Sequence, residues 1–276
     1  MTSHDVVQRV RRILGTRAAG HTGTLDPFAT GLLIVMIGPA TRLARFVEGQ
    51  DKTYLATARL GVTTDTDDLT GRVLETTPIG GPVDASRVAH VLNEFIGPQL
   101  QRPPQYSAKH VAGERSYQKA RRGEAVKLEP VAVTVNRIEM IECHLPLVTF
   151  RIMVSAGTYI RAIARDLGQR LGVGAHLSSL RREAIGSLRV EDATSLERLS
   201  AGSLISPPAV LANIPTVELD SAGRVAVSHG RAVVDSGKAG KRESGEVVAL
   251  LEAGELVAIA RAEDGWLRPT VVLGTA

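Results

Sequence analysis

The segment AGSLISPPAVLANIP at 201–215 limits how this chain can fold more than any other stretch of its 276 residues. Besides small residues it holds three prolines, and proline neither continues a helix interior nor donates to a sheet ladder. We therefore expect a domain boundary here, between a large domain over 1–206 and a small one over 207–276. In the small one, short apolar runs alternate with glycines, which predicts a β-rich domain of about five or six short strands.

The part before the boundary mixes helical and β-like patterns. Apolar residues at helical spacing predict helices at 3–15 capped by Ser3, at 39–47, at 84–97 capped by Asp84, and at 157–172 capped by Thr158. Apolar and β-branched runs predict strands at 32–37, 52–60, 131–141 and 147–155, with a loop at 61–71. The aspartates of that loop do not fit an EF-hand, because its glycine and closing glutamate are misplaced, so no calcium site is expected.

Cysteine usage and hydropathy restrict where the protein works. Cys143 is the only cysteine, which rules out an internal disulfide framework and a cysteine-rich zinc site and suits a reducing compartment. The longest strongly apolar run, Leu32 to Gly38, is far shorter than a membrane span, and the N-terminus lacks the basic and apolar regions of a secretory signal. We expect a cytoplasmic protein that does not insert into a membrane.

The positive charge of the chain is concentrated before the boundary. Residues 1–206 hold 26 Lys and Arg against 20 Asp and Glu, whereas residues 207–276 hold 7 against 9. Within the larger part, the segment 102–127 carries seven basic residues and only two acidic ones. This segment has the charge to follow a nucleic-acid backbone, although a solvated charged helix face would look the same in sequence.

The most distinctive segment is GHTGTLDPFATGLL at 20–33. Pro27 pushes Asp26 toward an extended conformation, and the surrounding glycines permit tight turns and close approach by a ligand backbone. Such a loop presents one carboxylate. It is not a phosphate-binding loop, because the Gly-Lys-Ser/Thr ending is absent. Taken alone, Asp26 is also explained as an Asx-turn or capping residue.

Further motifs follow along the chain and change the weight of this segment. They are TSHDVV at 2–7, DKTYLATARLG at 51–61, TDTDDLTG at 64–71, PPQYSAKHVAGERSYQKARRGEAV at 103–126, and GTYIRAIARDLG with GAHLSSLRR at 157–182. Together with GHTGTLDP they resemble, in order, the TruB family of tRNA pseudouridine synthases, which isomerise uridine 55 in the T arm of tRNA. The resemblance spans most of the chain, so it is far more specific than any single motif.

The resemblance implies roles for individual residues. Asp26 matches the nucleophilic aspartate, Tyr54 the tyrosine that stacks on the target base, and Arg161 the arginine that pairs with the aspartate. The remaining matched residues are expected to contact RNA: His21 and Thr22 in the loop that shapes the RNA pocket, Tyr159 lining the site, and Lys109, Tyr117 and Lys119 in an RNA-gripping insertion at about 102–127. Without the resemblance, these would be ordinary strand, helix, turn and surface residues.

The implied reaction needs no cofactor and no metal. It breaks the N1–C1′ bond, turns the detached uracil and rejoins it through C5, without net redox change or hydrolysis. One ionised carboxylate can then suffice, and Arg161 would keep Asp26 ionised through a charge-assisted pair. An aromatic platform would offset the few kcal/mol needed to flip the uridine out of its loop. The order of the chemical steps stays open at this level.

The resemblance also implies the fold: an α/β (α+β) catalytic domain on a mixed, largely antiparallel sheet with flanking helices, then a PUA-like C-terminal domain. We expect a monomer that binds the T arm of tRNA. Relatives begin with a strand and a Lys-Pro motif before the TSHDVV helix, so the gene product is expected to extend upstream of Met1. If that absence disabled the site, the chain would be a non-catalytic tRNA-binding or folding factor. A nucleoside glycosidase would instead release free uracil.

Overall fold

The computed structural model describes residues 1–80, 83–106, 110–111, 114–115, 122, 128–235 and 242–273. Its helices are α1 (Ser3–Leu14), α2 (Ala44–Glu48), α3 (Ala85–Asn93), α5 (Ile160–Leu171), α6 (Pro207–Val210) and α7 (Ser221–Ser228), with 3-10 turns at Gly38–Leu43, Val190–Asp192 and Ala201–Ser203. The strands before the predicted boundary are β1 (Ala19–His21), β2 (Thr30–Gly31), β3 (Val35–Ile37), β4 (Lys52–Leu60), β5 (Val62–Thr64), β6 (Val73–Thr76), β7 (Gly97–Gln101), β8 (His110–Val111), β9 (Glu114–Arg115), β10 (Val131–His144), β11 (Leu147–Val154), β12 (Ala175–Ile185) and β13 (Leu188–Arg189). Those after it are β14 (Thr216–Glu218), β15 (Val233–Val234), β16 (Val247–Glu252), β17 (Glu255–Glu263) and β18 (Trp266–Val272).

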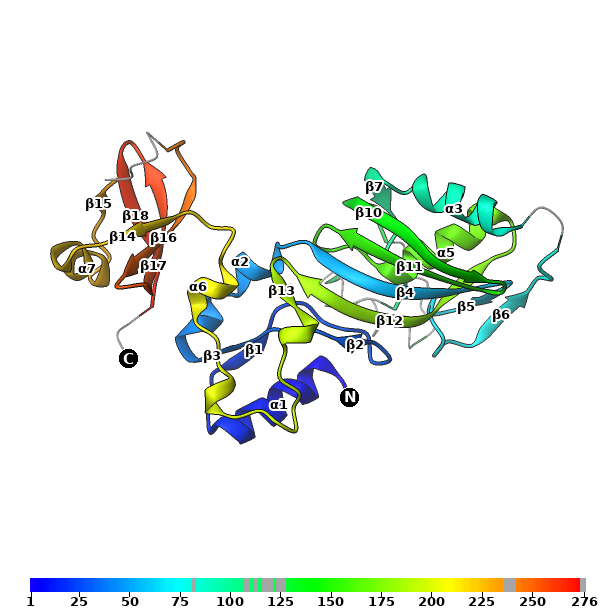
Figure 1. The fold of residues 1–276 in the computed structure, drawn as a ribbon, viewed down its shortest axis with the longest axis horizontal. Coiled ribbons are helices and arrows are strands. Elements are labelled where there is room, and N and C mark those ends of the chain that lie inside the picture. The colour runs from blue at the N-terminus through cyan, green and yellow to red at the C-terminus, as the bar shows by residue number, and fades with distance from the viewer. Residues whose placement is uncertain are drawn as a thin grey trace.

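The largest sheet has the order β13-β12-β4-β11-β10-β7, and β2 joins it beside β12. All of its pairings are antiparallel except the one between β2 and β12. The predicted mixed, largely antiparallel sheet is therefore confirmed. Figure 1 shows it at one end of an elongated molecule, with the C-terminal strands at the other end and α1 near the junction.

Alternation along β4 explains how this sheet builds its core. Tyr54, Ala56, Ala58 and Leu60 point to one face and are buried, because strand side chains alternate with a period of two. The buried side of α5 packs against this face, and α3 completes the same apolar cluster. Burying one large aliphatic side chain contributes about 1.5–3 kcal/mol, so this cluster holds the elements that carry the candidate site in place.

Two predicted helix caps are wrong, and the reasons bear on the site. Thr2, not Ser3, accepts the hydrogen bond that caps α1, which leaves the Ser3 hydroxyl free to accept the Leu25 N–H at 3.0 Å. The residue that precedes α5 is Tyr159, while the Thr158 hydroxyl donates to the Ser155 carbonyl. The cap predicted at Asp84 is confirmed.

The short elements differ most from the sequence prediction. The run expected as a strand at 32–37 pairs only over Val35–Ile37, and the expected loop at 61–71 contains β5, which pairs with β6. The helix expected at 39–47 begins as a 3-10 turn before α2. Such segments are too short for periodicity to define, and their pairing partners decide their structure.

The C-terminal part is β-rich, as predicted. Its five strands have the order β14-β16-β17-β18-β15 around a separate apolar core, and α7, which the sequence analysis missed, packs on it. The proline-containing segment is not a loose linker. Val210 and Leu211 are buried in a second cluster together with Val47 from the first part and Ile259 from β17. This apolar contact joins the two parts of the molecule.

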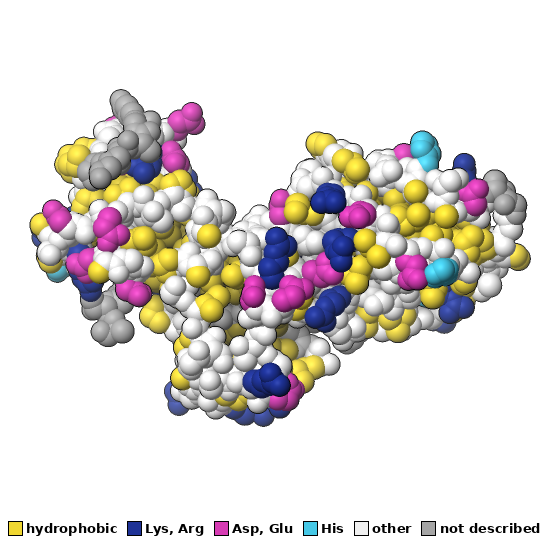
Figure 2. Space-filling view, viewed as in Figure 1, with side chains coloured by type: hydrophobic (Ala, Val, Ile, Leu, Met, Phe, Trp, Pro, Cys, Tyr) yellow, Lys and Arg dark blue, Asp and Glu magenta, His cyan; other side chains and the backbone are white. Residues whose placement is uncertain are grey.

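Two expectations from the sequence concern the charge of the surface and insertion into a membrane. Figure 2 shows positive and negative side chains interspersed over the sheet face turned to the viewer. On the strands of this sheet, Arg151 forms an ion pair with Glu183 and Arg137 forms one with Glu139. Over the described ranges, no helix combines the length and apolar character needed to cross a membrane.

Candidate active site

Asp26 lies in the loop between β1 and β2, and its neighbours are tied down on both sides. Before it, the Leu25 N–H donates to the Ser3 hydroxyl at the start of α1. After it, the Ala29 N–H donates to the Asp26 carbonyl at 2.9 Å. The carboxylate keeps 28% of its surface exposed, so it is held in place and can still be reached.

Arg161, in the first turn of α5, holds this carboxylate by both oxygens. Its Nε donates to Asp26 Oδ2 at 3.0 Å and its Nη2 to Asp26 Oδ1 at 2.9 Å. The other guanidinium contacts are to the carbonyls of Thr66 and Tyr106, both at 3.0 Å, and to Asp68 Oδ2 at 3.5 Å. A buried guanidinium with such a full set of acceptors is rigid, so it fixes the direction of the Asp26 carboxylate.

Asp68 is the second carboxylate of the site, and the sequence analysis did not single it out. It is buried, and its Oδ1 accepts the hydroxyl of Thr66 at 2.7 Å and both the N–H and the hydroxyl of Thr70, at 2.9 and 2.6 Å. These bonds leave Oδ2 facing Arg161. The loop at 64–71, whose aspartates do not fit a calcium site, therefore supports the Arg161 side chain through Asp68.

Burial and two charged neighbours, Arg161 and Asp68, act on the pKa of Asp26. Burial raises the pKa of this carboxyl above its usual value, Arg161 opposes the rise through its charge and hydrogen bonds, and Asp68 adds to it. The net direction is upward because desolvation is the largest of these effects. A carboxylate in this setting is a stronger base than a free aspartate.

Tyr54 and Arg182 lie together under the Asp26 loop. Tyr54, on β4, is 7% exposed and lies opposite Arg182 on the adjacent strand β12. Burial raises the pKa of the Tyr54 phenol, Arg182 opposes this, and Asp26 adds to it. Because the Arg182 side chain donates to the carbonyls of Gly23 and Leu32, it places Tyr54 beside the Asp26 loop.

A second arginine pair borders the site. Arg165, one turn after Arg161, donates to Asp67 Oδ2 at 3.0 Å and to the Arg102 carbonyl at 2.9 Å. Asp67 has a φ of 60°, which is uncommon outside glycine. This pair connects the loop at 64–71 to the start of the basic segment at 102–127.

Comparison with known proteins identifies the family. Residues 11–160 match the model of the TruB family pseudouridylate synthase (N terminal domain), and residues 161–206 match the tRNA pseudouridylate synthase B C-terminal domain. The chain belongs to the TruB family. A tRNA pseudouridine synthase B from Thermobifida fusca is 42% identical over 281 residues, which cover 98% of this chain and 94% of that protein.

Other relatives agree. A tRNA pseudouridine synthase B from Burkholderia mallei (strain NCTC 10247) is 39% identical over 279 residues, covering 98% of this chain and 92% of that protein. Among solved structures, an H/ACA RNP bound to a substrate RNA containing 2′-deoxyuridine matches with a TM-score of 0.76 and 26% identity, covering 100% of this chain and 82% of that chain. The predicted resemblance to the TruB family is confirmed.

The other residues that the TruB resemblance singled out fall into two groups. His21 ends β1 and Thr22 begins the Asp26 loop, and the buried atoms His21 Nδ1 and Thr22 Oγ1 have no hydrogen-bond partner among the described residues. Burial and the charge of Arg182 lower the pKa of His21. Tyr159 is half-buried at the start of α5, where its main chain exchanges two hydrogen bonds with the Gln101 side chain. The second group, Lys109, Tyr117 and Lys119, lies outside the described residues.

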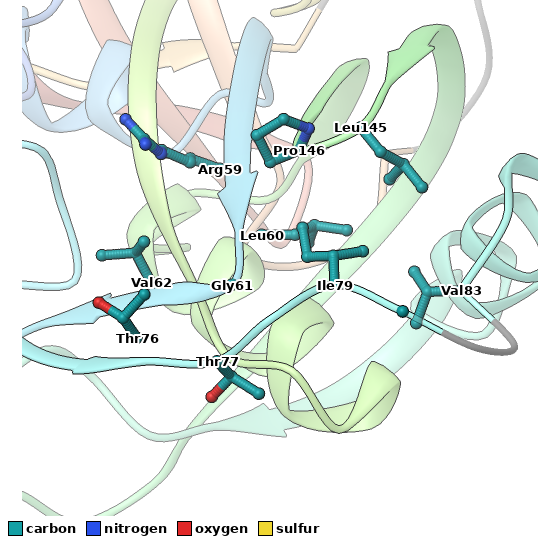
Figure 3. A pocket seen from close by; sticks show the side chains of 11 residues that line it. Arg59, Leu60, Gly61, Val62, Thr76, Thr77, Ile79, Val83, Leu145 and Pro146 are labelled. Carbon is teal, nitrogen blue, oxygen red and sulfur yellow. The ribbon is translucent and has the colours of Figure 1, made fainter.

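Two cavities lie at different distances from Asp26. One of about 430 Å³ is lined by Arg59 to Val62, Thr76, Thr77, Ile79, Gly80, Val83, Leu145 and Pro146 (Figure 3). It sits at the other end of β4 from Tyr54, since Leu60, which lines it, is six residues or roughly 20 Å along the strand from Tyr54. Its lining residues include no carboxylate. The other, of about 940 Å³, runs from Asp26 between α1 and the segments 29–40 and 188–211, and its lining is mostly apolar.

Among the residues that the structure describes, no three or more His, Cys, Asp or Glu side chains are grouped so that they could hold a metal ion. The described site residues missed from sequence were Asp67, Asp68, Arg165 and Arg182. The first two stand in the motif TDTDDLTG, and the last stands in GAHLSSLRR, so the motifs contained the signal although the individual roles were not assigned.

Proposed function

We propose that this chain is a tRNA pseudouridine synthase that isomerises uridine 55 in the T arm of tRNA, with Asp26 as its nucleophile. The observation that carries the proposal is the Asp26 carboxylate, bound by both oxygens to the buried guanidinium of Arg161 and still exposed on one side. The relatives named tRNA pseudouridine synthase B support tRNA as the substrate.

The proposed reaction is balanced without a co-reactant. The N1–C1′ bond of the uridine breaks, the uracil turns while it is retained in the site, and a bond forms between C5 and C1′. The proton lost from C5 is matched by one gained at N1. The Asp26 carboxylate acts as the nucleophile, at C1′ of the sugar or at C6 of the base, and Arg161 holds it in the ionised form.

Tyr54 is proposed to receive the flipped base. A uridine inside a folded RNA loop must first leave its stack, which costs a few kcal/mol. Stacking on an aromatic ring returns about 1–3 kcal/mol per base. The Tyr54 ring suits this role because Tyr54 pairs across the sheet with Arg182, whose side chain is bonded to both ends of the Asp26 loop.

RNA binding is proposed to involve the residues around this centre. His21, Thr22 and Tyr159 would line the pocket, and Lys109, Tyr117 and Lys119 in the basic insertion at about 102–127 would contact the T arm from outside. Phosphate contacts would position the RNA, and the flipped base would be read in the pocket. We also propose a monomeric, cytoplasmic enzyme with a catalytic domain over 1–206 and a PUA-like domain over 207–276.

The decisive experiment maps pseudouridine in a tRNA transcript incubated with the purified protein. The wild type should convert position 55, and Asp26→Asn should bind the tRNA without converting it. Asp264→Asn is the matched control, because it makes the same chemical change at an exposed turn between β17 and β18. Release of free uracil would indicate a glycosidase, and binding by the wild type without conversion would indicate a tRNA-binding or folding factor.

A second experiment tests the basic insertion. Lys119→Ala should weaken tRNA binding and reduce its dependence on salt concentration, because each lost phosphate contact lowers the number of counterions released. The control is Arg137→Gln, on the mixed-charge face of the sheet, where the side chain is paired with Glu139. An equal loss of affinity in both variants would remove the insertion from the proposed binding surface.

A further inference from the structure

We propose that Arg182 is a positioning residue that sets the place of the Asp26 loop relative to Tyr54. The inference rests on the proposed function, since it assigns a role within the same site. Neither the family match nor the sequence motifs give this residue a task. Arg182 is the bulkiest side chain among those less than 2% exposed.

The contacts of Arg182 reach both ends of the loop. Its Nε donates to the Leu32 carbonyl at 2.7 Å, and its Nη2 donates to the Gly23 carbonyl at 3.2 Å. Arg182 also lies opposite Tyr54 in the pairing of β12 with β4, and its charge acts on the Tyr54 phenol. One rigid, planar group therefore fixes the residues on either side of Asp26 and lies beside the aromatic ring proposed to hold the base.

The main chain around Arg182 strengthens this link. Gly31 in β2 pairs with Arg182 in β12, and the Leu32 N–H donates to the Arg182 carbonyl at 2.9 Å. The approach is so close that a side chain at Gly31 would place its Cβ 2.2 Å from the Arg182 carbonyl oxygen. Gly31 also has a φ of 102°, which strongly favours glycine. The end of the loop is thus locked to the strand that carries the arginine.

The environment of Arg182 argues against a purely structural role. Among the described residues, the hydrogen bonds of its side chain go to main-chain carbonyls rather than to a carboxylate. A second cation, Lys52, is buried nearby. A Cβ at Gly23 would lie 3.6 Å from Arg182 Nη1 and 3.6 Å from Lys52 Cε, so the two side chains approach the same side of Gly23. Burying an uncompensated cation is costly, and an apolar side chain of similar volume would fill the space at lower cost. A positioning role explains why arginine stands here.

The expected effect is on turnover rather than on tRNA affinity. A misplacement of about 1 Å between reacting groups can slow a reaction on the order of 100-fold. Phosphate contacts supply much of the affinity of a protein for RNA, and the buried Arg182 side chain is out of reach of a phosphate backbone. Loss of the Arg182 contacts should therefore lower kcat and leave KM for tRNA nearly unchanged.

The test compares Arg182→Met and Arg182→Lys with Arg151→Met, an exposed arginine of the same sheet paired with Glu183. Arg182→Met should lower kcat on the order of 100-fold with KM changed less than about 2-fold. Arg182→Lys should recover part of the loss, and Arg151→Met should behave as the wild type. In a Tyr54→Phe background the loss caused by Arg182→Met should be smaller, because the interaction between the guanidinium and the Tyr54 hydroxyl is already gone. Wild-type kcat in Arg182→Met, or equal loss in both backgrounds, would overturn the inference.

Gly31→Ala tests the same junction if Arg182→Met fails to fold. It should lower kcat with tRNA binding retained, and a wild-type kcat would contradict the proposal. A crystal structure of either variant supplies a readout that does not depend on activity, since the loop from Gly23 to Leu32 should be displaced relative to Tyr54. If the loop does not move in the variant, the inference is overturned, even when the wild type forms pseudouridine. If the loop moves in the variant but the wild type is inactive, only the proposed function has failed.

Discussion

The large sheet and the C-terminal sheet differ in what they bury. Among the described residues, every buried polar or charged side chain lies before the domain boundary predicted after residue 206. These residues are Ser3, Thr22, Gln50, Lys52, Thr64, Asp68, Gln101, Arg161, His176 and Arg182. In the described part after it, the nearest case is the ion pair between Arg242 and Asp235, whose side chains are 9% and 7% exposed. The C-terminal core is otherwise apolar.

This difference indicates that the large sheet gives up part of its folding free energy to bury the charged groups around Asp26. Burying a charge is unfavourable unless it is well bonded, so a fold under no other constraint fills its core with apolar side chains. The C-terminal sheet follows that rule. The large sheet departs from it around Asp26, where the buried Arg161 holds the carboxylate, the buried Asp68 faces Arg161, and the buried Arg182 holds the two ends of the loop.

The largest effect is expected at Asp26. Asp26→Asn should lower pseudouridine formation by at least about 1,000-fold, since it removes the nucleophile, while tRNA affinity stays within about 3-fold. Turnover and filter binding on the same preparation measure the two quantities. Residual turnover near the wild-type value would remove Asp26 from its role.

The next effect is expected at Arg161. Arg161→Ala leaves the half-buried Asp26 carboxylate and the buried Asp68 carboxylate without their shared partner, which should lower the free energy of unfolding by about 3–5 kcal/mol. Turnover should fall on the order of 100-fold, because the carboxylate loses its orientation. Denaturant unfolding and single-turnover kinetics test both. If only tRNA affinity changed, Arg161 would be a phosphate ligand instead.

An apolar core change in the C-terminal sheet should affect stability alone. Leu250 is fully buried in that core, so Leu250→Ala should lower the free energy of unfolding by about 2–5 kcal/mol. Turnover per folded molecule should remain that of the wild type at a temperature where the variant is folded. A loss of kcat comparable to that of Arg161→Ala would show that the two sheets are coupled in catalysis.

The pH dependence separates the charges around Asp26. An aspartate that must be ionised is active above its pKa, and burial raises this pKa, so kcat should fall at a higher pH than the usual value of 3.8 implies. Removing Arg161, which opposes the rise, should move this acid limb to higher pH. Asp68→Asn should move it to lower pH, because it removes a repelling carboxylate. Shifts of the same sign in both variants would contradict the assignment.

The smallest effect is expected on the surface of the C-terminal sheet. Arg268 and Glu263 form a pair whose side chains are 64% and 46% exposed. Arg268→Gln should therefore change the free energy of unfolding by less than about 1 kcal/mol and leave turnover unchanged. Thermal melting at low and high salt measures it. A larger loss would mean that exposed charges in this sheet matter as much as the buried ones around Asp26.

Sequence patterns predicted the long elements of the fold well. The strands expected at 52–60, 131–141 and 147–155 and the helices begun by Asp84 and ended by Gly15 are present, because each has enough residues for its period to be clear. The short strands β2, β5 and β6 and the extra helix α7 were missed or misjudged. Their structure depends on partners distant in sequence, which local patterns do not specify.

The candidate site divides along the same line. The sequence by itself determined that Asp26 stands in a glycine-bounded loop before a proline, that the chain carries the TruB motifs in order, and that its basic residues are concentrated before the boundary. Only the tertiary structure decided which groups surround the carboxylate. Asp68 and Arg182 lie 42 and 156 positions after Asp26, and they reach it, or the ends of its loop, only because β4, β12 and α5 pack together. Burial then gives these charges their strength, because they interact outside bulk water.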